Sequence, residues 1–292
     1  MSTIENKDIL FIINPNSGRK KAEKLSKKIK EYRPDFSFII TDNKKDFRKV
    51  LKDKVERYKL FVLVGGDGTV NSAVKNFIDL KDKILAVYPA GSGNGFAREL
   101  GYKPSLEKLM EAIKNPETVD IDVLQIGKRF CINVSGIGFD SFVAHQFHQQ
   151  KGRGLKNYIL ATVKSVFHFK PFDAAIINDD QKIEGKYQMI SIANTRQFGN
   201  NAFISPQSKP DDGIFELVLV KPFPFYLYLT FVFRMFTNAL KASKYIEYIS
   251  IRNQVEIISN FKHYHIDGDP KKSPGNLTVK ILEKKISFLK IP

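Results

Sequence analysis

Hydrophobic residues in the first third of the chain follow two alternating patterns. Short, wholly apolar runs occupy 9–13, 38–40, 60–64 and 84–88. Between them, apolar residues recur every three or four positions, as at Ala22, Leu25, Ile29 and Tyr32, and again at Val70, Ala73, Val74 and Phe77. Wholly apolar runs are typical of strands buried on both faces, and the wider spacing predicts amphipathic helices. Strands that alternate with helices predict a parallel, doubly wound sheet.

The pattern changes near Val119. Strand-like runs separated by Asn, Asp, Gly and Pro then follow one another, namely DVLQI, FCINV, AAIIN, QMISIA, FELVLV, VEIIS and LTVKIL. Short strands joined by turns predict a β-rich domain. Helical spacing interrupts this pattern twice, around Asn157–Phe167 and around Phe225–Ser243.

The chain length agrees with two domains, because 292 residues exceed the size at which a single core usually stops growing. We predict an α/β, Rossmann-like domain over residues 1–125 and a β-rich sandwich domain over 126–284. The last residues, 285–292, are expected to return to the first domain.

Composition narrows the possible partners and compartment. The chain carries 47 Lys and Arg against 31 Asp and Glu, a formal charge of +16, which favours anionic partners. The single cysteine, Cys131, permits no intramolecular disulfide, so we expect a cytoplasmic protein. The most apolar stretch, 222–233, is too short to span a bilayer, which needs about 20 residues.

Three glycine clusters each follow a predicted strand of the first domain. They are NPNSG at 14–18, GGDGT at 65–69 and GSGNG at 91–95. Because the carboxyl ends of parallel strands meet at one edge of a sheet, we expect the clusters to converge on one crevice. Glycine lets backbone amides approach an anion closely, and a following helix N-terminus offers further N–H groups. The clusters predict a phosphate-binding site.

Asp67 differs from what a simple anion site requires. A carboxylate beside phosphates is repelled unless a divalent cation lies between them, so Asp67 predicts magnesium. Thr69 begins the next helix, where its hydroxyl can cap the first turn or bind a phosphate oxygen. The alternative is a tight turn in which Asp67 is a helix cap. Neither GxxxxGK[ST] nor GxGxxG occurs, so a nucleotide would be held in another way.

Five segments in this order resemble the diacylglycerol kinase catalytic-domain family, which includes bacterial lipid kinases and sphingosine kinases. They are NPNSG, VGGDGTVN, PAGSGNGFAREL, SPQSKPDDGIF and HIDGDP. GGDGT alone is shared with NAD kinases, whereas the ordered set is specific. The resemblance covers nearly the whole chain. It implies a nucleotide-binding α/β domain, a β-sandwich domain, and the use of ATP and Mg²⁺.

The resemblance also implies which residues bind the nucleotide. They are Asn14, Thr41, Gly65, Gly66, Asp67, Gly68, Thr69, Gly91, Ser92, Gly93 and Asn94. Asp67 would bind the magnesium linked to ATP. The segment DNKKDF after Thr41 departs from the family pattern.

Family members carry Asp-Gly-Glu in the second domain, and this chain has Asp267, Gly268 and Asp269 instead. The resemblance implies that Asp267 is the general base, while Asp269 is a shorter carboxylate in the place of the glutamate. An ordinary hairpin turn is the alternative, because Asp-Gly and Pro suit turns. His263 and His265 share a strand face with Asp267, but they do not make up a full set of metal ligands. We therefore expect the two histidines to have surface or supporting roles.

A second magnesium is implied at SPQSKPDDGIF. Asp212 would bind this structural ion with its carboxylate, and Lys209 and Ile214 would bind it with backbone carbonyls. Such an oxygen set suits a hard cation, although Asp-Gly also occurs in ordinary turns.

Together these observations predict an ATP-dependent kinase that transfers the γ-phosphate to a lipid hydroxyl of a diacylglycerol or sphingoid-type acceptor. We expect it at the inner face of the membrane, as a peripheral cytoplasmic protein, with a possible homodimer and no nucleic-acid partner. The aromatic stretch 223–236 and the basic helix 19–30 are candidate membrane contacts, against the alternatives of core and solvated surface. An NAD kinase-like enzyme and a non-catalytic lipid-binding protein are the competing functions.

Overall fold

The computed structural model describes residues 4–14, 19–78, 80–149, 162, 165–166, 168–178 and 181–291, and the side chains of 19–22, 147–149 and 284 lie outside this description. The chain divides into two compact units. The first comprises residues 1–121 and 284–292, and the second comprises 122–283.

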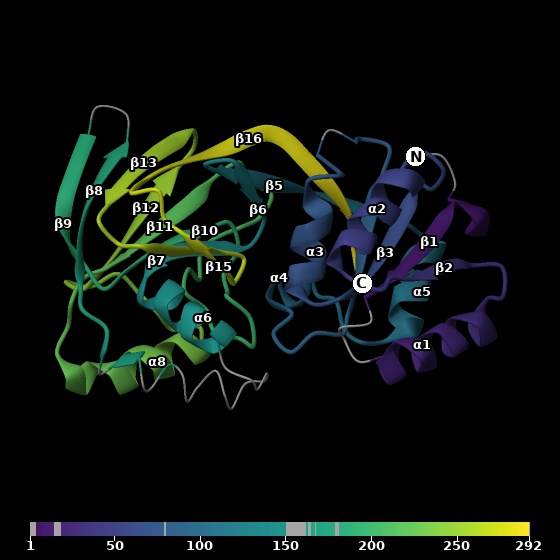
Figure 1. The fold of residues 1–292 in the computed structure, drawn as a ribbon, viewed down its shortest axis with the longest axis horizontal. Coiled ribbons are helices and arrows are strands. Elements are labelled where there is room, and N and C mark those ends of the chain that lie inside the picture. Colours follow the sequence, from purple (N-terminus) through teal and green to yellow (C-terminus); the bar gives the residue numbers. More distant parts are fainter. Residues whose placement is uncertain are drawn as a thin grey trace. The chain divides into compact units, whose positions relative to one another are not determined.

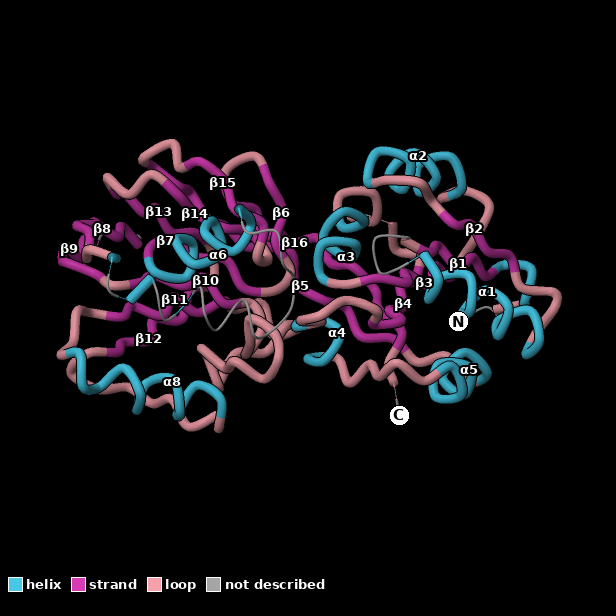
Figure 2. Tube along the Cα trace, turned by 60° about the horizontal axis from the view of Figure 1, so that its bottom comes forward, coloured by secondary structure: helices cyan, strands magenta, loops and turns pink. Residues whose placement is uncertain are grey.

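A parallel sheet flanked by helices forms the first unit (Figure 1). Its strands are β1 (Ile9–Ile13), β2 (Ser37–Ile40), β3 (Leu60–Gly65) and β4 (Ile84–Pro89), in the order β2-β1-β3-β4. The last residues of β16 (Asn276–Leu289) pair in parallel with β4. Its helices are η1 (Asn6–Asp8), α1 (Arg19–Tyr32), α2 (Lys44–Lys54), α3 (Asp67–Val74), α4 (Gly95–Glu99) and α5 (Leu106–Lys114). Helices α2 and α5 lie on opposite sides of the strands (Figure 2). The predicted α/β fold is confirmed.

The apolar composition of the central strands explains why they lie in the middle of the sheet. Every residue of β1 and β3 is buried, because helices cover both faces of the sheet. Phe61 of β3 packs edge-on against Phe77, with 5.0 Å between ring centroids. Since β1, β3 and β4 run in parallel, the segments that follow them begin at the same edge of the sheet.

Two antiparallel sheets form the second unit. One contains β13 (Gln254–Ser259), β8 (Phe172–Asn178), β9 (Gln181–Tyr187) and the first part of β16, with β5 (Thr118–Ile126) and β6 (Arg129–Cys131) beside them. The other has the order β12 (Ile246–Ile251), β11 (Phe215–Val220), β10 (Met189–Ala193), β7 (Val134–Gly138), β14 (His263–Ile266) and β15 (Asp269–Lys272). The predicted β-sandwich is confirmed.

The alternation of side chains along β11 explains how this unit is layered. Phe215, Leu217 and Leu219 belong to the core that also contains residues of the first sheet. Val218 and Val220 point to the opposite face and join a second apolar cluster. That cluster is covered by α8 (Tyr228–Phe236), which follows the short helix η3 (Phe225–Leu227). On another part of the unit, α6 (Phe139–Gln149) packs against β7 and β14.

The second helical insertion is shorter than the spacing predicts. The helix ends at Phe236 rather than Ser243, because Asn238 adopts a left-handed conformation with φ +55°. The predicted helix at 157–167 falls mostly outside the described residues. Within the described part of the chain, no helix is both long and apolar enough to cross a membrane.

Candidate functional site

The end of β3 and the start of α3 form the GGDGT loop. Gly66 caps α3, and its carbonyl accepts the Thr69 N–H at 2.9 Å. Thr69 is buried, and its Oγ1 accepts a hydrogen bond from Asn14 Nδ2 at 2.8 Å. Asn14 follows β1, so this bond joins the ends of two neighbouring strands. The rest of the predicted NPNSG segment, 15–18, lies outside the described residues.

The GSGN turn after β4 is closed by the side chain of one asparagine. Asn94 Oδ1 accepts the Gly91 N–H at 3.0 Å, and Asn94 Nδ2 donates to the Gly91 carbonyl at 2.8 Å. Asn94 has φ +51° and is the cap residue of α4. Ser92 and Gly93 lie between them, with Ser92 exposed to solvent. The turn therefore has a fixed shape before any ligand binds.

Three glycines of the two loops are needed for contacts within the protein. A Cβ atom on Gly91 would lie 2.6 Å from Gly66 Cα, and a Cβ on Gly66 would lie 3.0 Å from Gly91 Cα. A Cβ on Gly65 would lie 2.3 Å from Thr69 Oγ1. Gly68 differs, because a Cβ there would meet nothing within 4 Å. Of these four glycines, Gly68 is the one that faces open space.

Asp67 connects the same two loops. Its Oδ1 accepts the N–H of Phe96, in the first turn of α4, at 3.1 Å. Burial raises the pKa of the Asp67 carboxyl, and the backbone N–H groups of Gly95 and Phe96 lower it by less. Asp67 is thus a cap, as the alternative interpretation held, although it caps α4 rather than its own helix. A partly buried carboxylate at this edge also suits a cation, because a cation would offset the cost of its burial.

Thr41 follows β2 at the same edge of the sheet. It is buried, and both its N–H and its hydroxyl donate to the Ile13 carbonyl, at 3.0 and 3.3 Å. The hydroxyl therefore fixes the end of β2 to the end of β1. Contact between Thr41 and a nucleotide stays a prediction.

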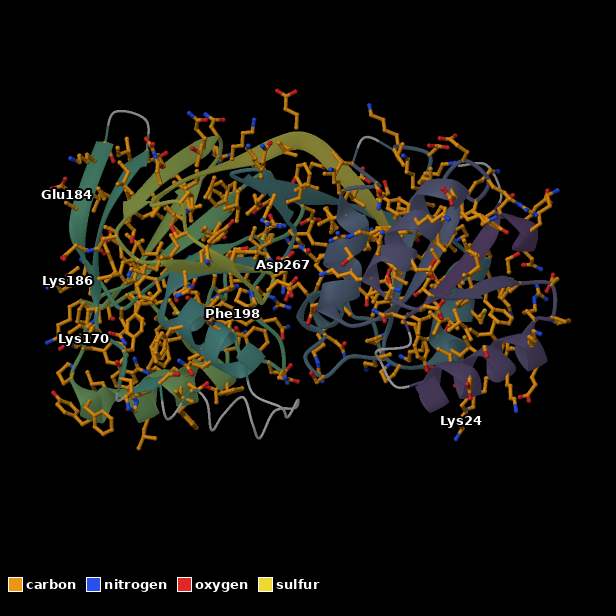
Figure 3. All side chains as sticks on the ribbon, in the orientation of Figure 1. Lys24, Lys170, Glu184, Lys186, Phe198 and Asp267 are labelled. Atoms are coloured by element: carbon orange, nitrogen blue, oxygen red, sulfur yellow. The ribbon has the colours of Figure 1, made fainter. Side chains whose placement is uncertain are left out.

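In the second unit, Asp267 lies in a tight hairpin between β14 and β15 (Figure 3). Asp267 and Gly268 both have positive φ, at +47° and +84°, as a two-residue hairpin turn requires. The carboxylate is nevertheless only 9% exposed. Its Oδ1 accepts the Asn133 N–H at 3.0 Å and lies 3.0 Å from Cys131 Sγ. The segment is a hairpin turn, and it also holds a carboxylate in a defined position, which an ordinary turn does not need.

Asp269 has a different environment from Asp267. It is the first residue of β15, is only partly buried, and lies 3.8 Å from Lys271 Nζ through Oδ2. The two carboxylates of the Asp-Gly-Asp segment therefore differ in burial and in partners.

A buried pair that the sequence analysis did not find supports the Asp267 turn. His265 is 2% exposed, and its Nδ1 accepts the Gly268 N–H at 3.2 Å. The ring proton must then lie on Nε2, which is 3.1 Å from Oδ2 of buried Asp140. Phe198 packs beside the His265 ring, with 5.9 Å between ring centroids. The sequence signal for this pair was the position of His265, two residues before Asp267. That signal did not reveal Asp140 of α6 as the partner of His265.

Cys131 is also part of this region. Its Sγ is fully buried, beside Asp267 and within 3.0 Å of the Ser135 hydroxyl. Burial, together with the negative charge of Asp267, raises the pKa of the Cys131 thiol well above its usual range. The thiol therefore stays protonated at neutral pH, as suits a small buried side chain rather than a nucleophile.

The predicted structural magnesium segment forms a compact turn. Asp212 Oδ1 accepts the Ile214 N–H at 3.0 Å, as in an ordinary Asp-Gly turn. Buried Asp122 supports the same turn, because its Oδ2 accepts the Gly213 N–H at 2.7 Å. Within the described residues, no three His, Cys, Asp or Glu side chains are grouped as metal ligands. The oxygen donors named for the ion, Lys209, Asp212 and Ile214, include one carboxylate, so magnesium here stays a prediction.

Comparison with known families matches both units. Residues 8–126 match the model of the diacylglycerol kinase catalytic domain, and 133–286 match that of the YegS C-terminal NAD kinase beta sandwich-like domain. The fold and the paired glycine loops define a kinase of this two-domain class. The chain belongs to the diacylglycerol kinase catalytic-domain family, as the resemblance implied.

Individual relatives agree with this assignment. A diacylglycerol kinase of Bacillus subtilis (strain 168) is 26% identical over 220 residues, covering 72% of this chain and 73% of the relative. A diacylglycerol kinase structure from Bacillus anthracis str. Sterne has a TM-score of 0.75 at 19% identity, covering 98% of this chain and 97% of the other. An NAD kinase from Archaeoglobus fulgidus in complex with ATP has a TM-score of 0.57 at 14% identity, covering 97% and 94%. The two structural likenesses concern the fold alone.

The open position of Gly68 leads to a first prediction. Gly68→Ala should leave the unfolding free energy unchanged or raise it by about 0.5–1 kcal/mol, because alanine favours the helix and meets no atom. Gly91→Ala should lower it by about 1–3 kcal/mol, because the methyl overlaps Gly66. Denaturant unfolding of both variants measures the difference. Equal destabilisation by the two substitutions would contradict the conclusion that Gly68 faces open space while Gly91 packs against Gly66.

The buried histidine leads to a second prediction. His265→Ala removes one partner of Asp140, whose Oδ2 also accepts the Ser191 hydroxyl, and the acceptor of the Gly268 N–H, so it should lower the unfolding free energy by about 2–4 kcal/mol. His265→Asn should recover part of the loss, because its Oδ1 takes the place of Nδ1. Maleimide labelling of Cys131 under native conditions provides an independent measurement, and should accelerate at least about tenfold in the alanine variant. Labelling at the wild-type rate would show that His265 does not hold the turn.

Proposed function

We propose that this protein is an ATP-dependent lipid kinase that transfers the γ-phosphate of ATP to a lipid hydroxyl. The observation that carries the proposal is the junction of two glycine loops at one edge of a parallel sheet, in a chain that belongs to a kinase family. ATP and Mg²⁺ would be the nucleotide and cofactor. The acceptor would be a diacylglycerol or a sphingoid-type lipid.

The nucleotide would bind to the first unit. Backbone amides of Gly91–Asn94 and of the first turn of α3 would receive the phosphates, and Gly68 would let a phosphate approach the backbone closely. Asp67 would hold magnesium, since this hard cation prefers carboxylate oxygens and would offset the cost of burying the charge of Asp67. Magnesium would neutralise the charge that the phosphoryl oxygens carry in the transition state.

The second unit would supply the general base. A lipid alcohol is protonated at neutral pH, so a carboxylate must accept its proton as the new P–O bond forms. Asp267 suits this role, because the N–H of Asn133 and the Cys131 thiol fix its Oδ1. Asp269, which takes the place of the family glutamate, would assist from β15. A structural magnesium bound by Asp212 and by the carbonyls of Lys209 and Ile214 would stabilise the turn that contains these residues.

Two other functions are compatible with the same fold, and each differs from the proposed one in the ligands that the protein would bind. The likeness to NAD kinases supports NAD as an alternative acceptor, and a lipid-binding protein without activity would retain the fold but not ATP binding. We place the enzyme in the cytoplasm, at the inner face of the membrane, because its proposed acceptor is a membrane lipid.

Phosphate transfer from radiolabelled ATP and Mg²⁺ to a panel of lipid alcohols in mixed micelles tests the proposal. We expect transfer to one lipid class, with Asp267→Asn slowing it at least about a hundredfold through loss of the base. Asp269→Asn should have a smaller effect, and Asp173→Asn, at an exposed position of β8, should have none. NAD belongs in the same panel, and transfer to NAD alone would move the protein to the NAD kinase class.

Asp67→Asn separates metal binding from folding. The asparagine Oδ1 can still accept the Phe96 N–H, whereas the negative charge of the Asp67 carboxylate is lost. Because burial raises the pKa of Asp67, the ionised carboxylate destabilises the folded state, so the uncharged variant should be at least as stable as wild type without ligand. It should nevertheless lose the thermal stabilisation by ATP and Mg²⁺ and the transfer activity. Normal turnover by this variant would exclude the metal role.

A further inference from the structure

The helix α8 is apolar on both sides. One side packs inward, where Phe231 and Met235 contact the second apolar cluster and Tyr228 stacks near Phe223 at 4.6 Å between ring centroids. The opposite side faces solvent. It forms a row of large apolar side chains, here called the α8 stripe, which consists of Phe225, Tyr226, Leu229, Phe233 and Phe236.

The exposure of the α8 stripe is unusual for a folded chain. Leu229 is 83% exposed, Tyr226 is 75% and Phe233 is 67%. Leu229, Phe233 and Phe236 follow the i, i+4, i+7 spacing of one helix face, so they form a continuous strip rather than scattered residues. Helices that are apolar all round are normally buried, and contiguous apolar patches mark interaction sites.

Charge around the α8 stripe indicates what covers it. Between 217 and 246 the chain has four basic residues, Lys221, Arg234, Lys241 and Lys244, and no acidic residue, although Lys221 pairs with Glu247 at 3.4 Å. All four are exposed, in a chain whose formal charge is +16. Aromatic and leucine side chains beside long basic side chains suit the boundary of an anionic bilayer, where rings enter the acyl region and cations stay among headgroups. A second copy of so basic a surface would be repelled.

We propose that the α8 stripe docks this protein onto an anionic lipid bilayer, with Lys241 and Lys244 contacting the headgroups. The inference deepens the proposed function, since it names the surface that meets the membrane holding the lipid acceptor. It does not depend on catalysis, because docking is measured by vesicle binding without ATP.

The main test is cosedimentation of the full chain with phosphatidylcholine vesicles that contain about one-third phosphatidylglycerol. The double variant Leu229→Ser/Phe233→Ser should bind at least about tenfold more weakly, because it loses the insertion of two large apolar side chains. Ile40→Ser/Ile258→Ser, which removes two exposed apolar residues elsewhere, should bind like wild type. Thermal unfolding of the stripe variant should match wild type, because its side chains are exposed.

A charge-matched pair tests the basic part of the surface. Lys241→Glu/Lys244→Glu should weaken vesicle binding and its salt dependence, whereas Lys108→Glu/Lys114→Glu, on exposed positions of α5, should change it much less. Vesicles of phosphatidylcholine alone should bind wild type weakly.

The proposal is overturned if wild type does not bind the anionic vesicles, or if the stripe variant binds them equally well. A lipid-free dimer that dissociates in the stripe variant, observed by analytical ultracentrifugation, would assign the surface to a second copy instead. Vesicle binding that depends on the stripe, without phosphate transfer to any lipid, would support the docking surface while refuting the proposed kinase activity.

Discussion

The first unit depends on the close backbone contact between two glycine loops. Gly66 and Gly91 approach so closely that neither can carry a side chain without displacing the other, and Asp67 ties its own loop to the start of α4. Side-chain bonds from Asn14 and Asn94 then fix the remaining freedom of the loops. These contacts hold the two loops together without a ligand, as a site that works by positioning and charge neutralisation requires.

The second unit fixes its candidate carboxylate in another way. A hairpin turn in the left-handed region presents Asp267. The Cys131 thiol of β6 and the Asn133 amide after β6 hold its carboxylate, and Asp140 of α6 supports the turn through His265. The histidine that supports the turn bonds through both ring nitrogens, so the position of the carboxylate is linked to Asp140, far away in the sequence. Such support explains why a two-residue turn, ordinarily mobile and solvated, can hold a buried charged group.

Much of the fold was predictable from local pattern. Runs buried on both faces identified the parallel strands, and turn-separated alternation identified the sandwich, because both are periodic properties of the sequence. The glycine loops were predictable for the same reason, since they follow strands. Their detailed role was not, because the requirement for Gly91 comes from a contact with Gly66 across the sheet edge. The pairing of His265 with Asp140 spans 125 residues, and no local pattern encodes it. The early end of α8 likewise depends on one left-handed asparagine.

The same helix shows why a pattern of apolar residues does not determine where they lie. Phe231 and Phe233 are alike in sequence and two residues apart, yet one packs against the second cluster and the other is 67% exposed. A core can use only one side of a surface helix, so the apolar residues on the other side carry a cost in water that folding of this unit does not remove. The proposed docking on a lipid surface would remove that cost, and an enzyme acting on the proposed membrane-lipid acceptor would have a physical reason to retain such residues.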